Sequence, residues 1–530
     1  MTQENELSNG TDNDIEEDSA GLTEEDILEV IPLEDNITGA SGDESDYEET
    51  DENGESSNSL PLSIALTEFK GHSKEGTSNQ VFVVDIPNCV SQSPSSADDP
   101  ILLIAASGGE DDRSFVWNLK DGQILREFAD FKDSVTCVKF NHKSTLLALG
   151  DMSGVISVVN AKSGDCCQDF QVGDLEWLEW HPSQDILLAG CSEGEIWLWL
   201  IVSEKERSAN LRCKVMASPG CGTPVGRFLP DGKHCLAGYQ DGSIRLWNLK
   251  TTTAQSLPYP VPGGESSVDF RAPPVTSCDI QEAPSGVGEG PVVQLIAVGF
   301  EDGSVLLLKF TPSSTVEAVS GGGLKLIRRL EPPACPPARS GLQEDQEAME
   351  TADDDDEPGQ NFTSREEGVN DMETEEDSFS VSAETLAFSP PSSSAGARYL
   401  AVGHLSGDLL IWDLSQTSSL SARHRCSHPA GLVKLQWLPS SFSASSIPEG
   451  SVVVTACLDG GIRLWDVRGG TLLSHFRAHE AEILDFRLFY SPDWSTSPPS
   501  SDGAVTCDSG GKIVTAGADG VCRVFQLTLS

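Results

Sequence analysis

Three consecutive carboxylates are the first residues in this sequence that could do chemistry. Glu110, Asp111 and Asp112 stand in the stretch GGEDDRSFVWNLK, directly ahead of an apolar run that ends in Trp117. Clustered carboxylates can ligate Mg²⁺ or Ca²⁺, act in general acid and base catalysis, or simply reverse the chain in a turn. The stretch alone does not distinguish these uses, so the rest of the chain must decide.

A second group could hold a metal ion. His424 and His428 lie four residues apart in SARHRCSHPAG, with Cys426 between them. No further ligand follows at a spacing suited to Zn²⁺, so an ordinary loop is the favoured interpretation. The sequence has no GxxxxGK[ST] phosphate loop, no GxSxG nucleophile turn and no HExxH pair. We therefore expect a protein that is not an enzyme and that uses no cofactor and no metal.

The opening stretch recurs along the chain as a hairpin signature. In each copy a β-rich run ends in a polar turn, and a second β-rich run closes on a bulky residue six positions after the turn residue. Seven of the eight turn residues are followed by glycine, which suits the left-handed conformations of a tight hairpin, and the first is followed by Asp112. The turn and closing residues are Asp111 and Trp117, Ser153 and Val159, Glu193 and Trp199, Asp241 and Trp247, Asp302 and Leu308, Ser406 and Trp412, Asp459 and Trp465, and Asp519 and Phe525.

The spacing of these turns predicts the fold. The shorter intervals between successive turn residues are 40, 42 and 48 residues, close to the 40 to 45 residues of a four-stranded propeller blade, and the longer intervals require insertions. Eight units predict an all-β fold, a single eight-bladed β-propeller over residues 61–530. The strand near 66–69 lacks an inner strand before it, so we expect it to pair with the last blade and close the ring. The opening carboxylates are then turn residues first.

The negative charge is concentrated in two segments. The chain has a net charge of -50, of which residues 1–60 carry -21 and residues 344–377 carry -15. Few apolar residues interrupt these charges, which predicts a disordered acidic tail at 1–60 and a disordered acidic insertion at about 312–382. The acidic balance argues against direct nucleic-acid binding and favours a basic partner.

Cysteine use and hydropathy indicate the compartment. The 14 cysteines stand in strand-like contexts without a CxxC pair, which favours a reduced interior. The N-terminus has no basic and apolar signal segment, and no apolar run is long enough for a membrane span. We expect a cytoplasmic monomer, also nuclear in part.

One aromatic and acidic stretch stands out as a binding element. In GDLEWLEWHPS, the carboxylates of Asp174 and Glu176 precede an inner strand in which Leu178 and Trp180 are predicted to be core residues. Carboxylates beside an exposed aromatic ring, here Trp177, suit Arg-rich peptides through charge-assisted hydrogen bonds and cation–π contacts.

Several motifs resemble the WD-repeat family. Trp-Asp occurs at 412–413 and 465–466, and Gly-His at 71–72, with AHEAEI at 478–483 as a weaker echo. The His, Ser/Thr, Asp and Trp network that is frequent in this family is therefore expected to be incomplete in several blades. In WD-repeat proteins the turns and the loops before the inner strands share one face, which commonly binds partners.

Longer strings resemble one branch of that family. GGEDDRSFVW, GDMSGVISV, GDLEWLEWHP, GYQDGSIRLWNLK, CLDGGIRLWD and AHEAEILDF are similar to the family of the angio-associated migratory cell protein and its fungal relative, a dedicated ribosomal-protein chaperone. This resemblance implies a non-enzymatic propeller whose acidic face captures a basic segment of a large-subunit ribosomal protein. The alternative is a WD-repeat scaffold that binds signalling proteins in cell migration.

Repeat alignment places twelve acidic residues on the turn and junction face as candidate partner-binding residues. They are Glu110, Asp111, Asp112, Asp151, Asp174, Glu176, Asp241, Glu301, Asp302, Asp459, Glu480 and Asp519.

Overall fold

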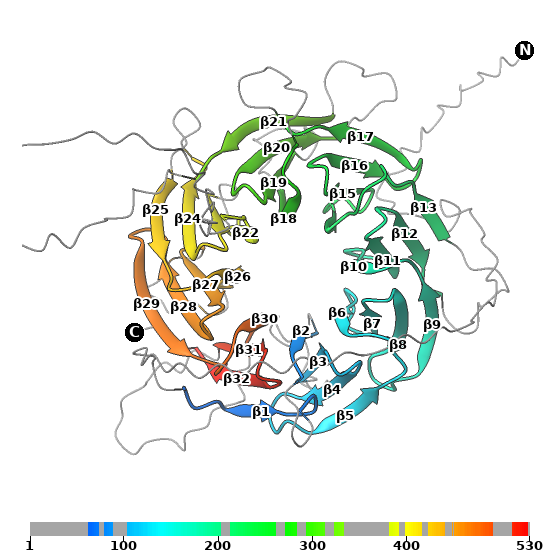
Figure 1. Cartoon of the computed structure of the whole chain (residues 1–530), viewed down its shortest axis with the longest axis vertical. Coiled ribbons are helices and arrows are strands. Elements are labelled where there is room, and N and C mark those ends of the chain that lie inside the picture. Colours follow the sequence, from blue (N-terminus) through cyan, green and yellow to red (C-terminus); the bar gives the residue numbers. More distant parts are fainter. Residues whose placement is uncertain are drawn as a thin grey trace, which may run out of the picture.

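The computed structural model shows a ring of β-sheets (Figure 1). It describes residues 62–73, 79–87, 103–202, 213–260, 271–282, 293–312, 323–332, 381–391, 398–415, 422–439, 442, 448, 450–490 and 511–527. The described elements are 32 strands, which form eight four-stranded antiparallel sheets. The predicted all-β, eight-bladed propeller is thus confirmed.

The blades are numbered in chain order, so that blade 1 contains β2 to β5 and blade 8 contains β30, β31, β32 and β1. The inner strands are β2 (Val81–Asp85), β6 (Val135–Phe140), β10 (Leu175–Trp180), β14 (Val225–Phe228), β18 (Val275–Glu282), β22 (Thr385–Phe388), β26 (Leu432–Trp437) and β30 (Ile483–Tyr490). The second strands are β3 (Ile104–Gly109), β7 (Leu146–Asp151), β11 (Ile186–Cys191), β15 (His234–Gly238), β19 (Gln294–Phe300), β23 (Tyr399–Gly403), β27 (Val452–Cys457) and β31 (Gly511–Gly517).

The third strands are β4 (Ser114–Asn118), β8 (Val155–Asn160), β12 (Ile196–Leu200), β16 (Ile244–Asn248), β20 (Val305–Thr311), β24 (Asp408–Asp413), β28 (Gly461–Asp466) and β32 (Cys522–Gln526). The outer strands are β5 (Ile124–Phe128), β9 (Cys166–Gln171), β13 (Cys213–Met216), β17 (Thr253–Leu257), β21 (Gly323–Leu330), β25 (Ala422–Ser427), β29 (Thr471–Arg477) and β1 (Thr67–Phe69).

The core lies between neighbouring blades. Every residue of the second strands β3, β11 and β27 is buried, whereas the outer strands β5 and β17 are mostly exposed. Apolar side chains of one blade pack against those of the next; the rings of Phe170 in blade 2 and Trp199 in blade 3, for example, stack at 4.4 Å. Burial on both sides explains why the second strands are continuous apolar runs rather than alternating ones.

The ring closes where the two ends of the described chain meet. β1 pairs antiparallel with β32, with Thr67 opposite Val524 and Phe69 opposite Cys522. Figure 1 shows β1 beside β32, on the outer side of the last blade. The ring of Phe69 also stacks on Trp117 at 4.7 Å, so the closing strand is fixed to blade 1 as well.

One boundary expected from the sequence was wrong. Residues 323–330, which the sequence analysis placed in the disordered insertion at 312–382, form β21, and this strand pairs with β20 along its length. Only Leu324 and Leu330 of β21 are buried, because an outer strand covers the core with one side and few residues. Its sequence, GLKLIRRL, is therefore hard to separate from the glycine- and proline-rich residues around it. The rest of the predicted insertion, at 313–322 and 333–380, and the predicted tail at 1–60 lie outside the described residues.

Candidate functional site

The eight hairpin turns lie at one end of the ring. Antiparallel pairing brings the turn between the second and third strands to the same end as the connection from each outer strand to the next inner strand. We call this end the turn face. Each turn contains one residue with positive φ, which is Gly in seven blades and Asp112, with φ of 56°, in blade 1. A Cβ on Gly154 would lie 2.3 Å from the carbonyl oxygen of Gly173, which shows how little room such a turn leaves for a side chain.

Two of the predicted site residues hold their own turns together. Asp111 Oδ1 lies 2.7 Å from Nδ1 of His72, and the Asp111 side chain is 1% exposed. Asp151 is fully buried and accepts hydrogen bonds from the backbone nitrogens of Lys132 and Val155. Both carboxylates are thus bound within the fold, Asp111 through Oδ1 alone, since its Oδ2 is buried without a hydrogen bond to another described residue.

Asp302 in blade 5 is also occupied. It accepts a hydrogen bond of 2.6 Å from the hydroxyl of Tyr259 and one of 2.9 Å from the backbone nitrogen of Ser304. The guanidinium of Arg329 adds an ion pair at 3.2 Å. Its charge is therefore largely compensated.

Two further predicted residues are neutralised by arginines four positions later. Asp459 pairs with Arg463, and Asp519 pairs with Arg523 at 2.5 Å and with His479 at 2.9 Å. Burial acts to raise the pKa of both carboxyls, but the hydrogen bonds and positive charges of these partners outweigh it and hold both pKa values below their usual range. These carboxylates stay ionised and serve the fold.

Blade 6 carries an equivalent pair that the sequence analysis did not single out. Arg425 on β25 donates to both carboxylate oxygens of Asp408 at the start of β24, at 2.8 and 2.6 Å. On the turn face, blades 6, 7 and 8 thus each have one aspartate bound by one arginine. We call this part of the turn face, with the pairs Asp408 and Arg425, Asp459 and Arg463, and Asp519 and Arg523, the paired arc.

The other half of the turn face presents carboxylates without such partners. None of six predicted residues forms an ion pair with another residue of the described chain, and five of the six are exposed, while the Asp112 side chain is half-buried. They belong to blades 1 and 3 to 5 and to the junction from blade 2 to blade 3. We call them the acidic arc: Glu110, Asp112, Asp174, Glu176, Asp241 and Glu301.

Like charges lie close together within the acidic arc. Partial burial, followed by repulsion from Asp133 and Asp111, raises the pKa of the Asp112 carboxyl. Partial burial and the charge of Asp174 likewise raise the pKa of Glu176. A positive charge placed beside these groups would reduce the repulsion between them, so the acidic arc favours the binding of a cation.

Glu480 is the last predicted residue and lies outside both groupings. Its side chain is exposed at the junction between blades 7 and 8. Its backbone carbonyl accepts from Arg477, and its backbone nitrogen lies 3.4 Å from Asp519. The backbone of this residue is fixed beside the paired arc while its carboxylate faces solvent.

The aromatic ring expected beside Asp174 and Glu176 is not exposed. Trp177 is 8% exposed and its indole nitrogen donates to the carbonyl of Thr223 at 2.8 Å. A β-bulge between Leu175 and Trp177 shifts the register of β10 and turns this ring toward the next blade. Trp177 therefore cannot offer a cation–π contact, although Leu178 and Trp180 are core residues as expected.

A histidine that sequence reasoning treated as a loop residue belongs to the core network. Nε2 of His428 lies 3.0 Å from the hydroxyl of Thr455 and 3.1 Å from the indole nitrogen of Trp465. Burial and then the charge of Arg463 lower the pKa of His428 to about 4. The only sequence signal was its place before a junction glycine, in SHPAG rather than Gly-His.

The three possible metal ligands of blade 6 do not converge. His424 contacts the carbonyl oxygen of Arg468 at 3.2 Å, whereas His428 turns into the blade 7 network and Cys426 is buried in the core. Within the described ranges, no group of three or more His, Cys, Asp or Glu residues is arranged to hold a metal ion. The described part of the chain also contains no helix with the length and hydropathy of a membrane span.

A ring of four-stranded blades with Asp-Gly turns, together with histidines bound to turn aspartates, defines a WD-repeat propeller. The WD domain, G-beta repeat model matches residues 223–248 and 440–466. The angio-associated migratory cell protein of Homo sapiens is 35% identical over 395 residues, which cover 74% of this chain and 72% of the human protein. The protein of the same name from Canis lupus familiaris is 36% identical over the same shares. The chain belongs to the angio-associated migratory cell protein family.

Solved structures of lower identity share the fold. The crystal structure of Saccharomyces cerevisiae Sqt1 has a TM-score of 0.58 at 18% identity, covering 88% of this chain and 99% of that one. The Chaetomium thermophilum Sqt1, solved bound to the N-terminus of the ribosomal protein L10, has a TM-score of 0.56 at 18% identity, covering 87% and 99%. This similarity is one of architecture.

Proposed function

We propose that this protein is a non-enzymatic chaperone whose acidic arc captures a basic segment of a large-subunit ribosomal protein. The observation that carries the proposal is the set of six carboxylates on one side of the turn face without ion-pair partners among the described residues. The fold shared with Sqt1, one example of which was solved with the N-terminus of ribosomal protein L10 bound, supports the same choice of client.

The proposed mechanism is electrostatic. Lys and Arg side chains of the client lie against the acidic arc, where charge-assisted hydrogen bonds form with carboxylates such as Glu110, Glu176 and Glu301. The long-range field accelerates encounter at low salt and is screened as salt rises. The captured groups are the ones that would otherwise contact RNA, so the client stays shielded until assembly. The encounter takes place in the cytoplasm, where ribosomal proteins are synthesised.

Affinity purification tests this function directly. The full chain, isolated from cells at low salt, is expected to bring down one basic ribosomal protein in an equimolar amount, identified by mass spectrometry. A peptide with the N-terminal sequence of that protein should bind the purified chain and dissociate at high salt. The equivalent of ribosomal protein L10 is the first client to test.

A signalling scaffold would behave differently. It would bring down a mixed set of proteins that stay bound at high salt, and no single ribosomal protein would dominate. That result would overturn the chaperone proposal.

A further inference from the structure

A ring of alternating charges lies inside the propeller, near the end opposite the turn face. It is formed by the last residue of β2 in blade 1, by the next-to-last residue of the inner strands in blades 2 to 4, and by the equivalent residue of blades 5 and 8. Negative and positive side chains alternate from blade 1 to blade 5, and a positive one returns in blade 8. We call this set the inner belt: Asp85, Lys139, Glu179, Arg227, Asp279 and Arg487.

The belt joins neighbouring blades. Nε of Arg487 in blade 8 donates to Asp85 Oδ1 in blade 1 at 2.9 Å, and the backbone nitrogen of Phe140 in blade 2 donates to Asp85 Oδ2 at 2.9 Å. Arg227 and Asp279 pair at 3.5 Å between blades 4 and 5. Both oxygens of Asp85 are therefore already occupied.

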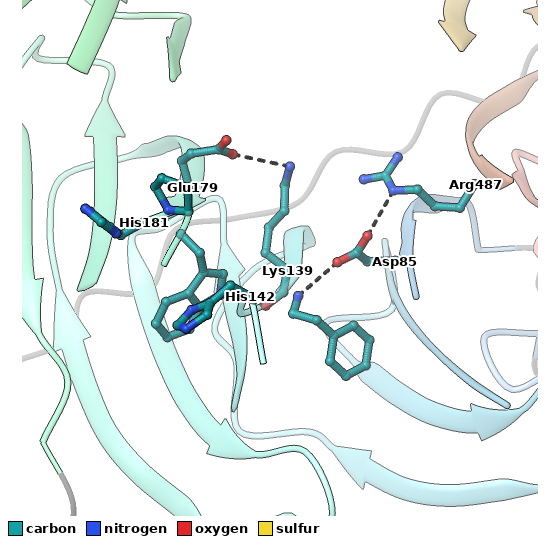
Figure 2. Close-up of a pocket in the computed structure, with 9 residues that line it drawn as sticks. Asp85, Lys139, His142, Glu179, His181 and Arg487 are labelled. Carbon is teal, nitrogen blue, oxygen red and sulfur yellow. Dashed lines mark hydrogen bonds and ion pairs between the residues drawn. The ribbon is translucent and has the colours of Figure 1, made fainter. Parts of the chain in front are cut away.

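The belt borders a hollow of about 270 Å³ among blades 8, 1, 2 and 3. Its walls include four belt residues, Asp85, Lys139, Glu179 and Arg487, and the apolar rings of Trp180 and Pro182. Figure 2 shows Lys139 and Arg487 projecting from different strands on either side of Asp85. The last residues of β6 and β10 line this hollow, so it opens at the end away from the acidic arc.

The hydrogen-bond donors in the hollow that lack an acceptor belong mainly to the two cationic side chains, Lys139 and Arg487. Nη1 of Arg487 contacts Asp485 Oδ1 and the carbonyl of Phe486, both at 3.1 Å, while Nη2 has no hydrogen bond to another described residue. The ammonium of Lys139 lies 3.6 Å from Glu179 Oε2, too far for a hydrogen bond, and its side chain is 36% exposed. Lys139 and Arg487 thus both line the hollow, and each has N–H groups without an acceptor among the described residues.

Of the two histidines that line the hollow, His181 has no capacity to spare, whereas Nδ1 of His142 is buried without a hydrogen bond to another described residue. His181 is buried, with Nε2 bound to the carbonyl of Gly232 at 3.0 Å and Nδ1 accepting from the backbone nitrogens of Ser183 and Gln184. Burial lowers the pKa of both His142 and His181, so they carry no charge near neutral pH. The complementary group must therefore be an acceptor for Lys139 and Arg487.

We infer that this hollow is a binding site for a carboxylate, which bridges the Lys139 ammonium and Nη2 of Arg487. The ligand carboxylate replaces Glu179 as the partner of Lys139, and Trp180 and Pro182 contact the apolar part of the ligand. Asp85 does not compete for Nη2 of Arg487, because both of its oxygens are already bound by Nε of Arg487 and the backbone nitrogen of Phe140. The site is separate from the acidic arc and takes a ligand of the opposite charge.

Titration of the full chain with N-acetylglutamate tests the site, with N-acetylglutaminamide, in which both carboxylates are replaced by amides, as the neutral match. Tryptophan fluorescence and calorimetry are the readouts, since Trp180 lines the hollow. N-acetylglutamate is expected to bind and N-acetylglutaminamide is not. Equal binding of the two probes, or binding of neither, would overturn the inference.

Three variants sharpen the test. Lys139→Gln should weaken N-acetylglutamate binding by about tenfold or more, as expected for one charge-assisted hydrogen bond. Glu179→Gln should strengthen it about fivefold, because a competing carboxylate is removed. Lys143→Gln is the matched control. It removes an exposed lysine that lies four residues after Lys139 and pairs with Asp185, and it should leave N-acetylglutamate binding unchanged.

Because Lys139→Gln should weaken binding and Glu179→Gln should strengthen it, the test stays informative if one variant folds poorly. Weaker N-acetylglutamate binding in Glu179→Gln, or equal losses of affinity in Lys139→Gln and Lys143→Gln, would show that the hollow does not bind the carboxylate. A peptide with one glutamate between aliphatic residues separates two sources of the ligand: tighter binding than N-acetylglutamate assigns the site to an acidic protein segment, and equal binding assigns it to a free carboxylic acid.

Discussion

The acidic arc and the paired arc lie on the same face of the ring, but the aspartate at the same position of the repeat has an arginine partner in one arc and not in the other. In blades 7 and 8 the turn aspartates Asp459 and Asp519 are bound by arginines four residues later. In blade 4 Asp241 and Arg245 have the same spacing, but the Arg245 guanidinium lies over the rings of Tyr239 and Trp247, at 5.3 and 6.0 Å. Asp241 therefore accepts a hydrogen bond from the backbone nitrogen of Ser243 but forms no ion pair with another described residue.

This difference teaches that repeat position alone does not define function. A turn aspartate with a cation beside it adds to the stability of its blade, because its pKa is lower in the folded than in the unfolded chain. A turn or junction carboxylate without one adds to the field outside the protein. The two uses of acidic residues can therefore be separated by mutation.

The largest expected effect comes from reversing the acidic arc. Glu110, Glu176 and Glu301 changed together to lysine should weaken binding of a basic client segment about a hundredfold, since each reversal replaces attraction by repulsion worth roughly 1 kcal/mol. Calorimetry at low salt measures this loss. Thermal unfolding should be nearly unchanged.

The matched control carries the same change of charge elsewhere. Asp121, Asp165 and Asp169 are exposed on loops away from the turn face and on an outer strand, and their reversal should alter affinity only slightly. If both triple variants lose affinity equally, net charge rather than the arc attracts the client.

The second effect is on stability and belongs to the paired arc. Arg523→Met removes the partner of Asp519, whose side chain is 13% exposed, and should lower the free energy of unfolding by about 3 to 5 kcal/mol. Denaturant titration measures it, and client affinity should persist in the folded fraction. Asp241→Asn is the counterpart in the acidic arc, with an expected change of less than about 0.5 kcal/mol. A large stability loss in Asp241→Asn would remove the distinction between the arcs.

The third effect is a pH dependence. The pKa of His428 is lowered from 6.5 to about 4, so the unfolded chain takes up this proton more readily than the folded one. The stability that the neutral histidine contributes is complete above pH 6.5 and is lost as the pH falls toward 4, by about 3 kcal/mol. Unfolding followed from pH 7 to 4 should show this slope, and the slope should be shallower in His428→Gln. An unchanged slope would place the responsible proton elsewhere.

The smallest effect concerns the one turn without glycine. Asp112→Gly should stabilise the fold by about 1 kcal/mol, because an ordinary side chain is strained at positive φ. The same change should weaken client binding slightly, since one carboxylate of the acidic arc is lost. Stabilisation without any loss of affinity would remove Asp112 from the binding surface.

The sequence predicted the number of blades and the positions of the turns, because a hairpin depends on local spacing. Asp459 and Asp519 could be placed on the turn face for the same reason. Whether each would be bound or free could not be predicted, since the orientation of Arg245 or Arg463 depends on neighbouring side chains. The burial of Trp177 was missed because a bulge in β10 changes which side of the strand faces the core.

The missed residues of the inner belt show the same limit. Lys139 and Arg487 are 348 positions apart in the sequence and have no shared motif, and they border one hollow only because the ring brings blades 2 and 8 close together. The outer strand β21 was missed for the opposite reason, since a strand that buries only two leucines has a weak local pattern.

The pairing of β1 with β32 also sets the order of events during synthesis. β1 emerges from the ribosome first among the strands, but its partner is the last strand made. The first seven blades can assemble while the chain still grows, whereas β1 has no strand partner until β32 has been made. A chain that stops before β32 would leave the ring open at this seam, with unpaired strand edges that can pair with other chains.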